Sequence, residues 1–187
     1  MPRGCREILK GLKKADVRVV SGVSDTYIGP IMESVRKDSF FRAVPVCCEE
    51  ESVAVARPKK SVVVIEGDGG LIMEMETLIS VGAKAPPNLL VITFYNNCYV
   101  SAGGQALPAD MINLEDFAKA ARFPQTATVD TPDGFEAALD GMLDSGKLGF
   151  INLLTASEPG EDPGGDIRPR PLENRANFKR WISENCP

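Results

Sequence analysis

A short glycine-rich segment, Gly67-Asp68-Gly69-Gly70, stands between the most apolar run of the chain and a helical pattern. Glycines let the backbone approach an anion closely, and the N-terminus of a helix offers free N–H groups to that anion. Asp68 adds a hard oxygen ligand, and a carboxylate beside a phosphate needs a cation between them, for which Mg²⁺ is the usual choice. The segment therefore predicts a site for a metal-bound phosphate.

A second polar segment, Asn96-Asn97, follows the next apolar run along the chain. Carboxyl ends of parallel strands meet at one edge of a sheet, and Asp68 and Asn96 are 28 positions apart, which fits one helical crossover. An Asp and an Asn from neighbouring strand ends could therefore share one metal ion. Each piece alone is more often a simple turn, but the order strand, Gly-Asp-Gly, helix, strand, Asn-Asn is far more specific.

Composition excludes several other chemistries. The 187 residues include no histidine, which removes the histidine-based nucleophile arrangements and metal sites. The net charge of −5 argues against binding to nucleic acid or to an anionic membrane surface. Five cysteines without a Cys-x-x-Cys spacing fit a reducing compartment, and the first residues show no signal peptide, so we expect a cytoplasmic protein without a membrane span.

The elements that must position these residues alternate between strands and helices, which predicts an α/β fold with a three-layer, doubly wound, mostly parallel six-stranded sheet. The expected strands cover 17–21, 43–47, 61–66, 89–94, 126–129 and 149–154. Pro45 places the second of them near an edge. The expected helices cover 7–14, 26–37, 49–57, 71–84, 114–121, 132–145 and 172–184.

The Gly-Asp-Gly and Asn-Asn segments resemble the cofactor motif of thiamine diphosphate-dependent enzymes, and Tyr99 with Gly103-Gly104-Gln105 falls in register with their sulfopyruvate and phosphonopyruvate decarboxylase branch. The resemblance implies that thiamine diphosphate and Mg²⁺ are the cofactors. It also implies that three groups hold the metal: the Asp68 side chain, the Asn96 side chain and the Cys98 carbonyl. The implied cofactor-binding residues are Gly67, Asp68, Gly69, Gly70, Leu71, Asn96, Cys98 and Tyr99.

The N-terminal third resembles a different domain of the same branch, the pyrimidine-binding domain. That domain supplies a glutamate to N1′ of the aminopyrimidine, and the register among Glu49-Glu50-Glu51 selects Glu50 as the catalytic residue. A solvated, dipole-capping helix start is the other interpretation of these three glutamates. Substrate contacts are expected from Ser24, Asp25, Gly103, Gly104 and Gln105, for which ordinary loop chemistry is the alternative.

The chain is shorter than the two family domains together. We expect one domain over 1–155, pyrimidine-domain-like over 1–56 and diphosphate-domain-like over 57–155, followed by a Pro/Gly-rich arm and a C-terminal helix over 156–187. Because family cofactors bind between two domains, we expect a homodimer or a higher homo-oligomer, in which Glu50 of one copy could lie over the cofactor of the other. A remnant, or a chain lacking an internal segment, is the alternative.

The resemblance implies a decarboxylase, a carbon–carbon lyase, that acts on a short 2-oxo acid such as sulfopyruvate or phosphonopyruvate. Two alternatives stay open at this point. One is a thiamine-dependent carboligase or lyase that uses a different acceptor. The other is a non-catalytic remnant or partner subunit that binds the cofactor weakly or not at all.

Overall fold

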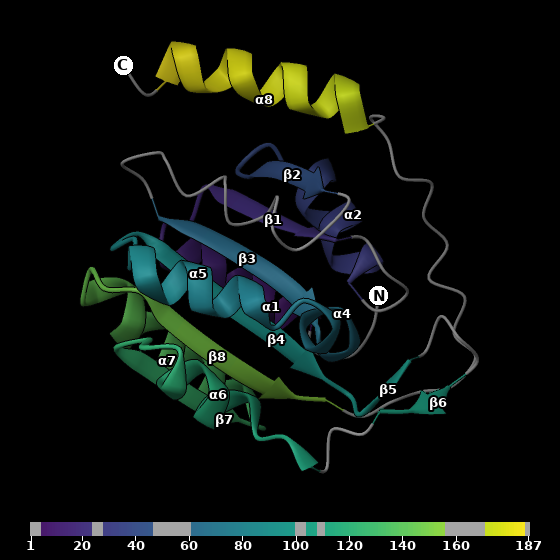
Figure 1. Cartoon of the computed structure of the whole chain (residues 1–187). Coiled ribbons are helices and arrows are strands. Elements are labelled where there is room, and N and C mark those ends of the chain that lie inside the picture. The colour runs from purple at the N-terminus through teal and green to yellow at the C-terminus, as the bar shows by residue number, and fades with distance from the viewer. Residues whose placement is uncertain are drawn as a thin grey trace.

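A computed structural model describes residues 5–23, 28–46, 61–99, 104–107, 111–155 and 171–185. Six parallel strands form one sheet in the order β2-β1-β3-β4-β8-β7 (Figure 1). The strands are β1 (Val19–Val23), β2 (Arg42–Val46), β3 (Val62–Gly67), β4 (Leu89–Tyr95), β7 (Gln125–Val129) and β8 (Gly149–Leu154). The expected α/β sheet is therefore confirmed, with strand ends displaced by at most two residues.

Helices cover both faces of the sheet and make it a three-layer structure (Figure 1). One face packs against α1 (Cys5–Lys14), α2 (Gly29–Lys37) and α7 (Pro132–Asp144). The other packs against α4 (Asp68–Met73), α5 (Glu76–Lys84) and α6 (Leu114–Ala120). Because side chains alternate along a strand, each central strand supplies apolar residues to both cores.

The centre of the sheet consists of β3 and β4, which are buried along nearly their whole length. Their apolar runs leave no polar face, as is typical of parallel strands covered on both sides. Pro45 lies in β2, which is an edge strand, so the expectation for this proline is confirmed. At an edge, a residue without an N–H costs the sheet little.

The expected helix over 71–84 was wrong as a single element. The structure divides it into α4 and α5 at Glu74 and Met75, although no proline or glycine stands there. At the break, the Thr77 N–H donates to the Glu74 carbonyl (3.0 Å) and the Leu78 N–H donates to the Met75 carbonyl (3.1 Å). These tighter i→i+3 bonds let the chain change direction between the two helices.

Helix α8 (Pro171–Asn185) confirms the expected C-terminal helix and lies beside β2 (Figure 1). Its rings of Phe178 and Trp181 are stacked, with centroids 6.1 Å apart, and both pack against the core of this same chain. The expected helix over 49–57 lies outside the described residues.

Candidate cofactor site

The predicted site residues meet at the carboxyl edge of the sheet, at the ends of its two central strands. Asp68 is the first residue of α4 and follows β3 directly, while Asn96 follows β4. The pairing of Gly67 with Phe94 keeps these two strand ends in register. The carboxylate of Asp68 is nearly enclosed, with 2% of the residue exposed.

Asp68 joins the two strand ends through its carboxylate. Its Oδ1 accepts a hydrogen bond from the Gly69 N–H (2.8 Å), and its Oδ2 accepts from the N–H groups of Asn96 (2.9 Å) and Asn97 (2.7 Å). Backbone donors offset part of the cost of burying a carboxylate, and carboxylate oxygens keep further lone pairs for a cation. The buried anion at this edge therefore fits a divalent metal ion that is bound through oxygen.

The two neighbouring asparagines have different structural roles. Asn96 turns its side chain back on the chain, so that its Oδ1 accepts from the Cys98 N–H (3.0 Å). Asn97 has a backbone φ of 56°, a left-handed conformation that asparagine adopts more readily than most residues. Asn97 therefore forms the turn. Asn96 is the expected metal ligand, and its side-chain oxygen keeps a second lone pair beside the one that accepts from the Cys98 N–H.

Tyr99 lies directly against Gly69. A Cβ added to Gly69 would come within 2.6 Å of Cε1 of the Tyr99 ring, so only glycine allows this close approach. Gly70 is half-buried, whereas the side chain of Leu71 lies in the core and is 2% exposed. Any contact of Leu71 with a cofactor would therefore have to use its backbone.

A small hairpin, which the sequence patterns did not predict, carries part of the expected substrate loop. Strand β5 (Cys98–Tyr99) pairs antiparallel with β6 (Gln105–Ala106), and Tyr99 stands opposite Gln105. Gly104 has a φ of 80° and donates its N–H to the Tyr99 carbonyl (2.9 Å). Gln105 is exposed and Gly104 half-buried, so the hairpin presents both beside Tyr99.

Four predicted site residues lie outside the described residues: Glu50, Ser24, Asp25 and Gly103. Ser24 and Asp25 follow β1 directly in the sequence, and Glu50 is four positions beyond the end of β2. Their expected roles therefore stay predictions.

A row of buried polar side chains, which sequence reasoning missed, crosses the sheet just inside the site. Glu66, Thr93 and Asn152 stand in register on β3, β4 and β8 and are 1%, 0% and 5% exposed. Within the described part of the chain, Thr93 Oγ1 and Asn152 Oδ1 have no hydrogen-bond partner. The signal in the sequence is a single polar residue near the end of each apolar strand.

The row continues at the edge of the sheet with an exposed member, Thr128, which stands opposite Asn152 on β7. Its hydroxyl donates to Glu115 Oε2 (2.6 Å), and this hydrogen bond, with those from Lys119 and Thr126, lowers the pKa of Glu115. A polar row of this kind gives the carboxyl end of the sheet hydrogen-bonding capacity that its apolar strands would otherwise lack.

Two kinds of feature are absent from the described part of the chain. Among the described residues, no three histidine, cysteine, aspartate or glutamate side chains gather as a metal cluster, and the expected set of one carboxylate, one amide and one carbonyl is not of that kind. No helix in the described part of the chain is long and apolar enough to cross a membrane.

Two decarboxylases are similar in sequence to this chain over about two thirds of its length. The chain is 33% identical over 127 residues to the sulfopyruvate decarboxylase of Methanosarcina acetivorans, which covers 67% of this chain and 32% of that protein. It is 30% identical over 132 residues to the phosphonopyruvate decarboxylase of Streptomyces viridochromogenes, covering 70% of this chain and 32% of the relative. The chain thus spans about a third of the length of these relatives.

A solved structure with the same fold is a 2-oxoglutarate:ferredoxin oxidoreductase from Magnetococcus marinus. It has a TM-score of 0.65 and 16% identity, and the match covers 96% of this chain and 67% of the other. Residues 51–153 match the family described as "Thiamine pyrophosphate enzyme, C-terminal TPP binding domain", and these residues include the whole Asp68–Asn96 site. The chain therefore belongs to the thiamine pyrophosphate enzyme family.

Proposed function

We propose that this protein is a thiamine diphosphate- and Mg²⁺-dependent decarboxylase of a short 2-oxo acid with an anionic tail, similar to sulfopyruvate or phosphonopyruvate. The observation that carries the proposal is the hydrogen-bonded pair of strand ends, in which buried Asp68 binds the N–H groups of Asn96 and Asn97. The family match and the names of the relatives support the reaction class.

The chain's own residues would hold the cofactor by its diphosphate. The Asp68 carboxylate, the Asn96 side-chain oxygen and the Cys98 carbonyl would bind Mg²⁺ as hard oxygen ligands. The backbone from Gly67 to Leu71, at the start of α4, would face the diphosphate. When bound, thiamine diphosphate supplies the nucleophilic carbon and the electron sink that decarboxylation of a 2-oxo acid requires.

Glu50 would hold and share the proton at N1′ of the aminopyrimidine. A carboxyl group suits this task when burial raises its pKa toward neutrality. Ser24, Asp25 and the segment Gly103 to Gln105 would contact the substrate. Because the chain contains no histidine, later proton transfers would use water or a carboxylate such as Asp25.

We also propose that the working protein is a homodimer or a higher homo-oligomer in the cytoplasm, with the site at an interface between copies. A relative from Methanothermobacter thermautotrophicus that is 35% identical over 65 residues is named "Sulfopyruvate decarboxylase subunit beta", so assembly from more than one chain occurs among relatives. In this assembly, Glu50 of one copy would reach the cofactor held by the other.

Titration calorimetry with thiamine diphosphate, with and without Mg²⁺, tests the cofactor site first. We expect binding that requires Mg²⁺ and that Asn96→Ala abolishes. Asn97→Gly is the matched control, because glycine adopts the left-handed backbone of residue 97 without losing an expected metal ligand. Absence of binding at millimolar cofactor would contradict the proposal and favour a non-catalytic remnant or partner subunit.

Release of CO₂ from sulfopyruvate and phosphonopyruvate then tests the reaction. Decarboxylation without an added aldehyde would separate a decarboxylase from a carboligase. We expect Glu50→Gln to abolish turnover while Mg²⁺-dependent cofactor binding persists. If Glu50→Gln turned over substrate at the unchanged rate, the role assigned to Glu50 would be wrong.

A further inference from the structure

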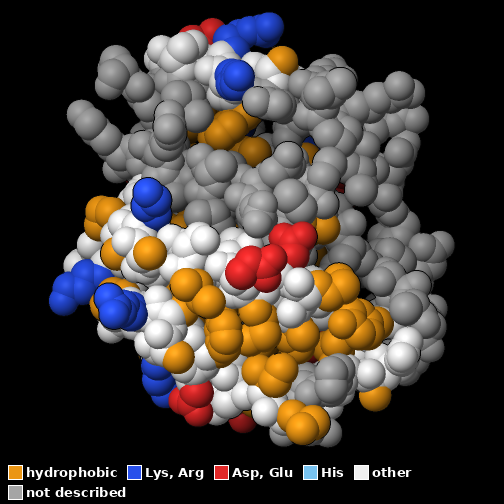
Figure 2. Space-filling model, in the orientation of Figure 1, with side chains coloured by type: hydrophobic (Ala, Val, Ile, Leu, Met, Phe, Trp, Pro, Cys, Tyr) orange, Lys and Arg blue, Asp and Glu red, His pale blue; other side chains and the backbone are white. Residues whose placement is uncertain are grey.

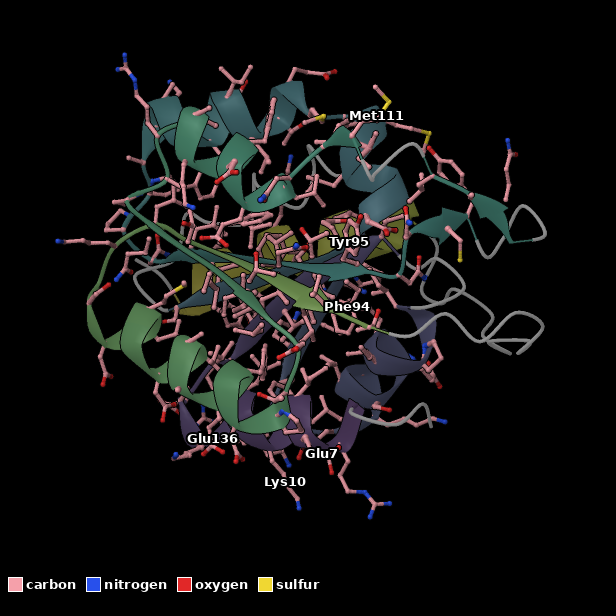
Figure 3. The ribbon with its side chains drawn as sticks, turned by 90° about the horizontal axis from the view of Figure 1, so that it is seen from below. Glu7, Lys10, Phe94, Tyr95, Met111 and Glu136 are labelled. Atoms are coloured by element: carbon pink, nitrogen blue, oxygen red, sulfur yellow. The ribbon has the colours of Figure 1, made fainter. Side chains whose placement is uncertain are left out.

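Large exposed apolar side chains gather on the face of the molecule formed by α4, α5 and α6. Met73 is 68% exposed, Ile79 56% and Met111 89%, and they belong to α4, α5 and the segment just before α6. Figure 2 shows hydrophobic side chains collected over this face. Figure 3 shows Met111 on this side and Glu7, Lys10 and Glu136 on the opposite side. The two outer surfaces of the sandwich therefore differ in character.

A groove runs between the exposed sides of α5 and α6. Its volume is about 360 Å³, and it is lined by Ile79, Ala83, Phe117, Ala120, Ala121 and Arg122. Apart from Arg122, every residue in this lining is apolar, and three of the six are alanines. Small side chains let a second helix approach closely, so the groove has the shape and the chemistry of a helix-docking surface.

Helix α5 presents one exposed stripe beside this groove. The exposed residues follow the spacing of a single helix face: Glu76, Ile79, Ser80, Ala83 and Lys84. Its middle is apolar or small, its first turn is acidic and its last turn is basic. Neither Glu76 nor Lys84 forms an ion pair with another described residue. Each end of the stripe thus carries a charge without an ion-pair partner among the described residues, and the two charges are opposite.

We propose that this face binds a second copy of the same chain, with the two α5 helices antiparallel about a two-fold axis near Ser80. Antiparallel pairing places Glu76 of each copy opposite Lys84 of the other, so the charges are complementary only in this orientation. Ile79 of one copy packs over Ala83 and the groove of the other. The stripe is therefore complementary to itself, which a contact between identical surfaces requires.

Helix α5 alone is too short to form the interface. Nine residues span about 13 Å, whereas a stable interface buries about 800 Å² on each partner. The lining of the groove on α6 and the exposed side chains of Met73 and Met111 add further apolar surface on the same face. This contact is separate from the site-forming contact of the proposed function and does not depend on it, because none of these residues belongs to the expected cofactor site.

Sedimentation velocity of the full chain without cofactor tests the pairing. The monomer has a mass of 20.1 kDa, and the α5 contact by itself gives a species of twice that mass. Ile79→Asp, which buries a charge in the interface, should sediment at half the mass of the wild type with an unchanged circular dichroism spectrum. Lys14→Glu, on the opposite face, is the matched surface control and should leave the dimer intact. A wild type that stays monomeric at millimolar concentration, or an Ile79→Asp variant that sediments at the wild-type mass, would overturn the proposal and leave this face to a different partner chain.

Charge reversal tests the orientation. Glu76→Lys alone and Lys84→Glu alone each create two like-charge contacts per dimer, and each should weaken self-association by about tenfold or more. A mixture of these two variants should form a heterodimer at wild-type strength, because each acidic residue then again faces a basic one. The double variant Glu76→Lys/Lys84→Glu should also recover the dimer. If the mixture associates no better than either variant alone, the antiparallel arrangement is wrong.

Discussion

The two helical layers of this protein cover the same sheet but differ in the side chains that they expose on their outer surfaces. On the side of α1, α2 and α7, ion pairs join neighbouring elements, as between Lys14 and Glu136 (2.5 Å) and between Lys13 and Asp38 (2.5 Å). On the side of α4, α5 and α6, three large apolar side chains are exposed, and the ion pairs among the described residues lie within α6 alone.

The difference between the two outer surfaces indicates that the two helical layers have different roles. Exposed ion pairs contribute little to stability, but they give a surface whose charges are already paired and which suits water. An apolar outer surface of helices is costly in water unless another surface covers it. The layer that begins with Asp68 therefore combines the candidate cofactor site with a surface for assembly, and the α1–α2–α7 layer faces solvent.

The largest expected effect is that of Asp68→Ala in the α4 layer. Three N–H groups, on Gly69, Asn96 and Asn97, lose their acceptor, so we expect a loss of about 3–4 kcal/mol in the free energy of unfolding, even without cofactor. Urea denaturation of the cofactor-free protein measures it. An unchanged midpoint would show that Asp68 matters only as a metal ligand.

A glycine in each layer gives a matched pair. A Cβ at Gly82 of α5 would lie 1.7 Å from the Ala121 carbonyl oxygen, so Gly82→Ala should separate α5 from α6 and cost about 3 kcal/mol. Gly141 of α7 has open space around its Cβ position, so Gly141→Ala should stabilise the protein by about 0.5–1 kcal/mol. Thermal unfolding of both variants checks the pair, and equal shifts would contradict the tight contact at Gly82.

The buried polar row allows a test of the sheet beneath the site. Thr93 is fully buried and its hydroxyl has no partner among the described residues, so Thr93→Val, which keeps the shape, should stabilise the protein by about 1 kcal/mol. Chemical denaturation measures the change. Destabilisation of similar size would instead reveal a partner for the hydroxyl, such as a bound water.

The smallest effect concerns pH and the ion-paired layer. Hydrogen bonds from Arg36 lower the pKa of Glu33 from 4.5 to about 2. Because the folded pKa is depressed, this pair stabilises the protein above about pH 4.5 and the contribution is lost as the pH falls toward 2. The pair is near the surface, so Glu33→Gln should cost only about 0.5 kcal/mol at neutral pH. Unfolding curves of wild type and variant should converge near the lower pH, and a constant difference would contradict the assignment.

Sequence patterns were sufficient for the sheet, because its strands β3, β4 and β8 are apolar over most of their length and are bounded by polar or glycine residues. They could not predict the break between α4 and α5, where no helix-breaking residue stands and the tight turn at Glu74 depends on packing. Sequence patterns also could not predict the hairpin of β5 and β6. Two-residue strands have no periodicity, and this hairpin is anchored by the buried Leu107, whose N–H donates to the Asn97 carbonyl.

For the site, motif spacing correctly brought Asp68 and Asn96 to one edge of the sheet. It could not show that the Asp68 carboxylate already binds three N–H groups, since those bonds depend on the register of β3 and β4 and on the left-handed turn at Asn97. The row from Glu66 to Asn152 was missed for a related reason. Its members are far apart in the sequence and become neighbours only through the strand order.

The hydrogen bonds of Asp68 also bear on how quickly and how tightly a ligand can be taken up. Because the N–H groups of Gly69, Asn96 and Asn97 are bound to Asp68 within the folded chain, the ordering of these two strand ends is part of the folding reaction and not of ligand capture. A ligand that docks here therefore loses little affinity to the conformational entropy of these strand ends. The consequence is a rigid binding site. The edge of the sheet binds ligands that match its existing shape and discriminates against ligands that would require it to move.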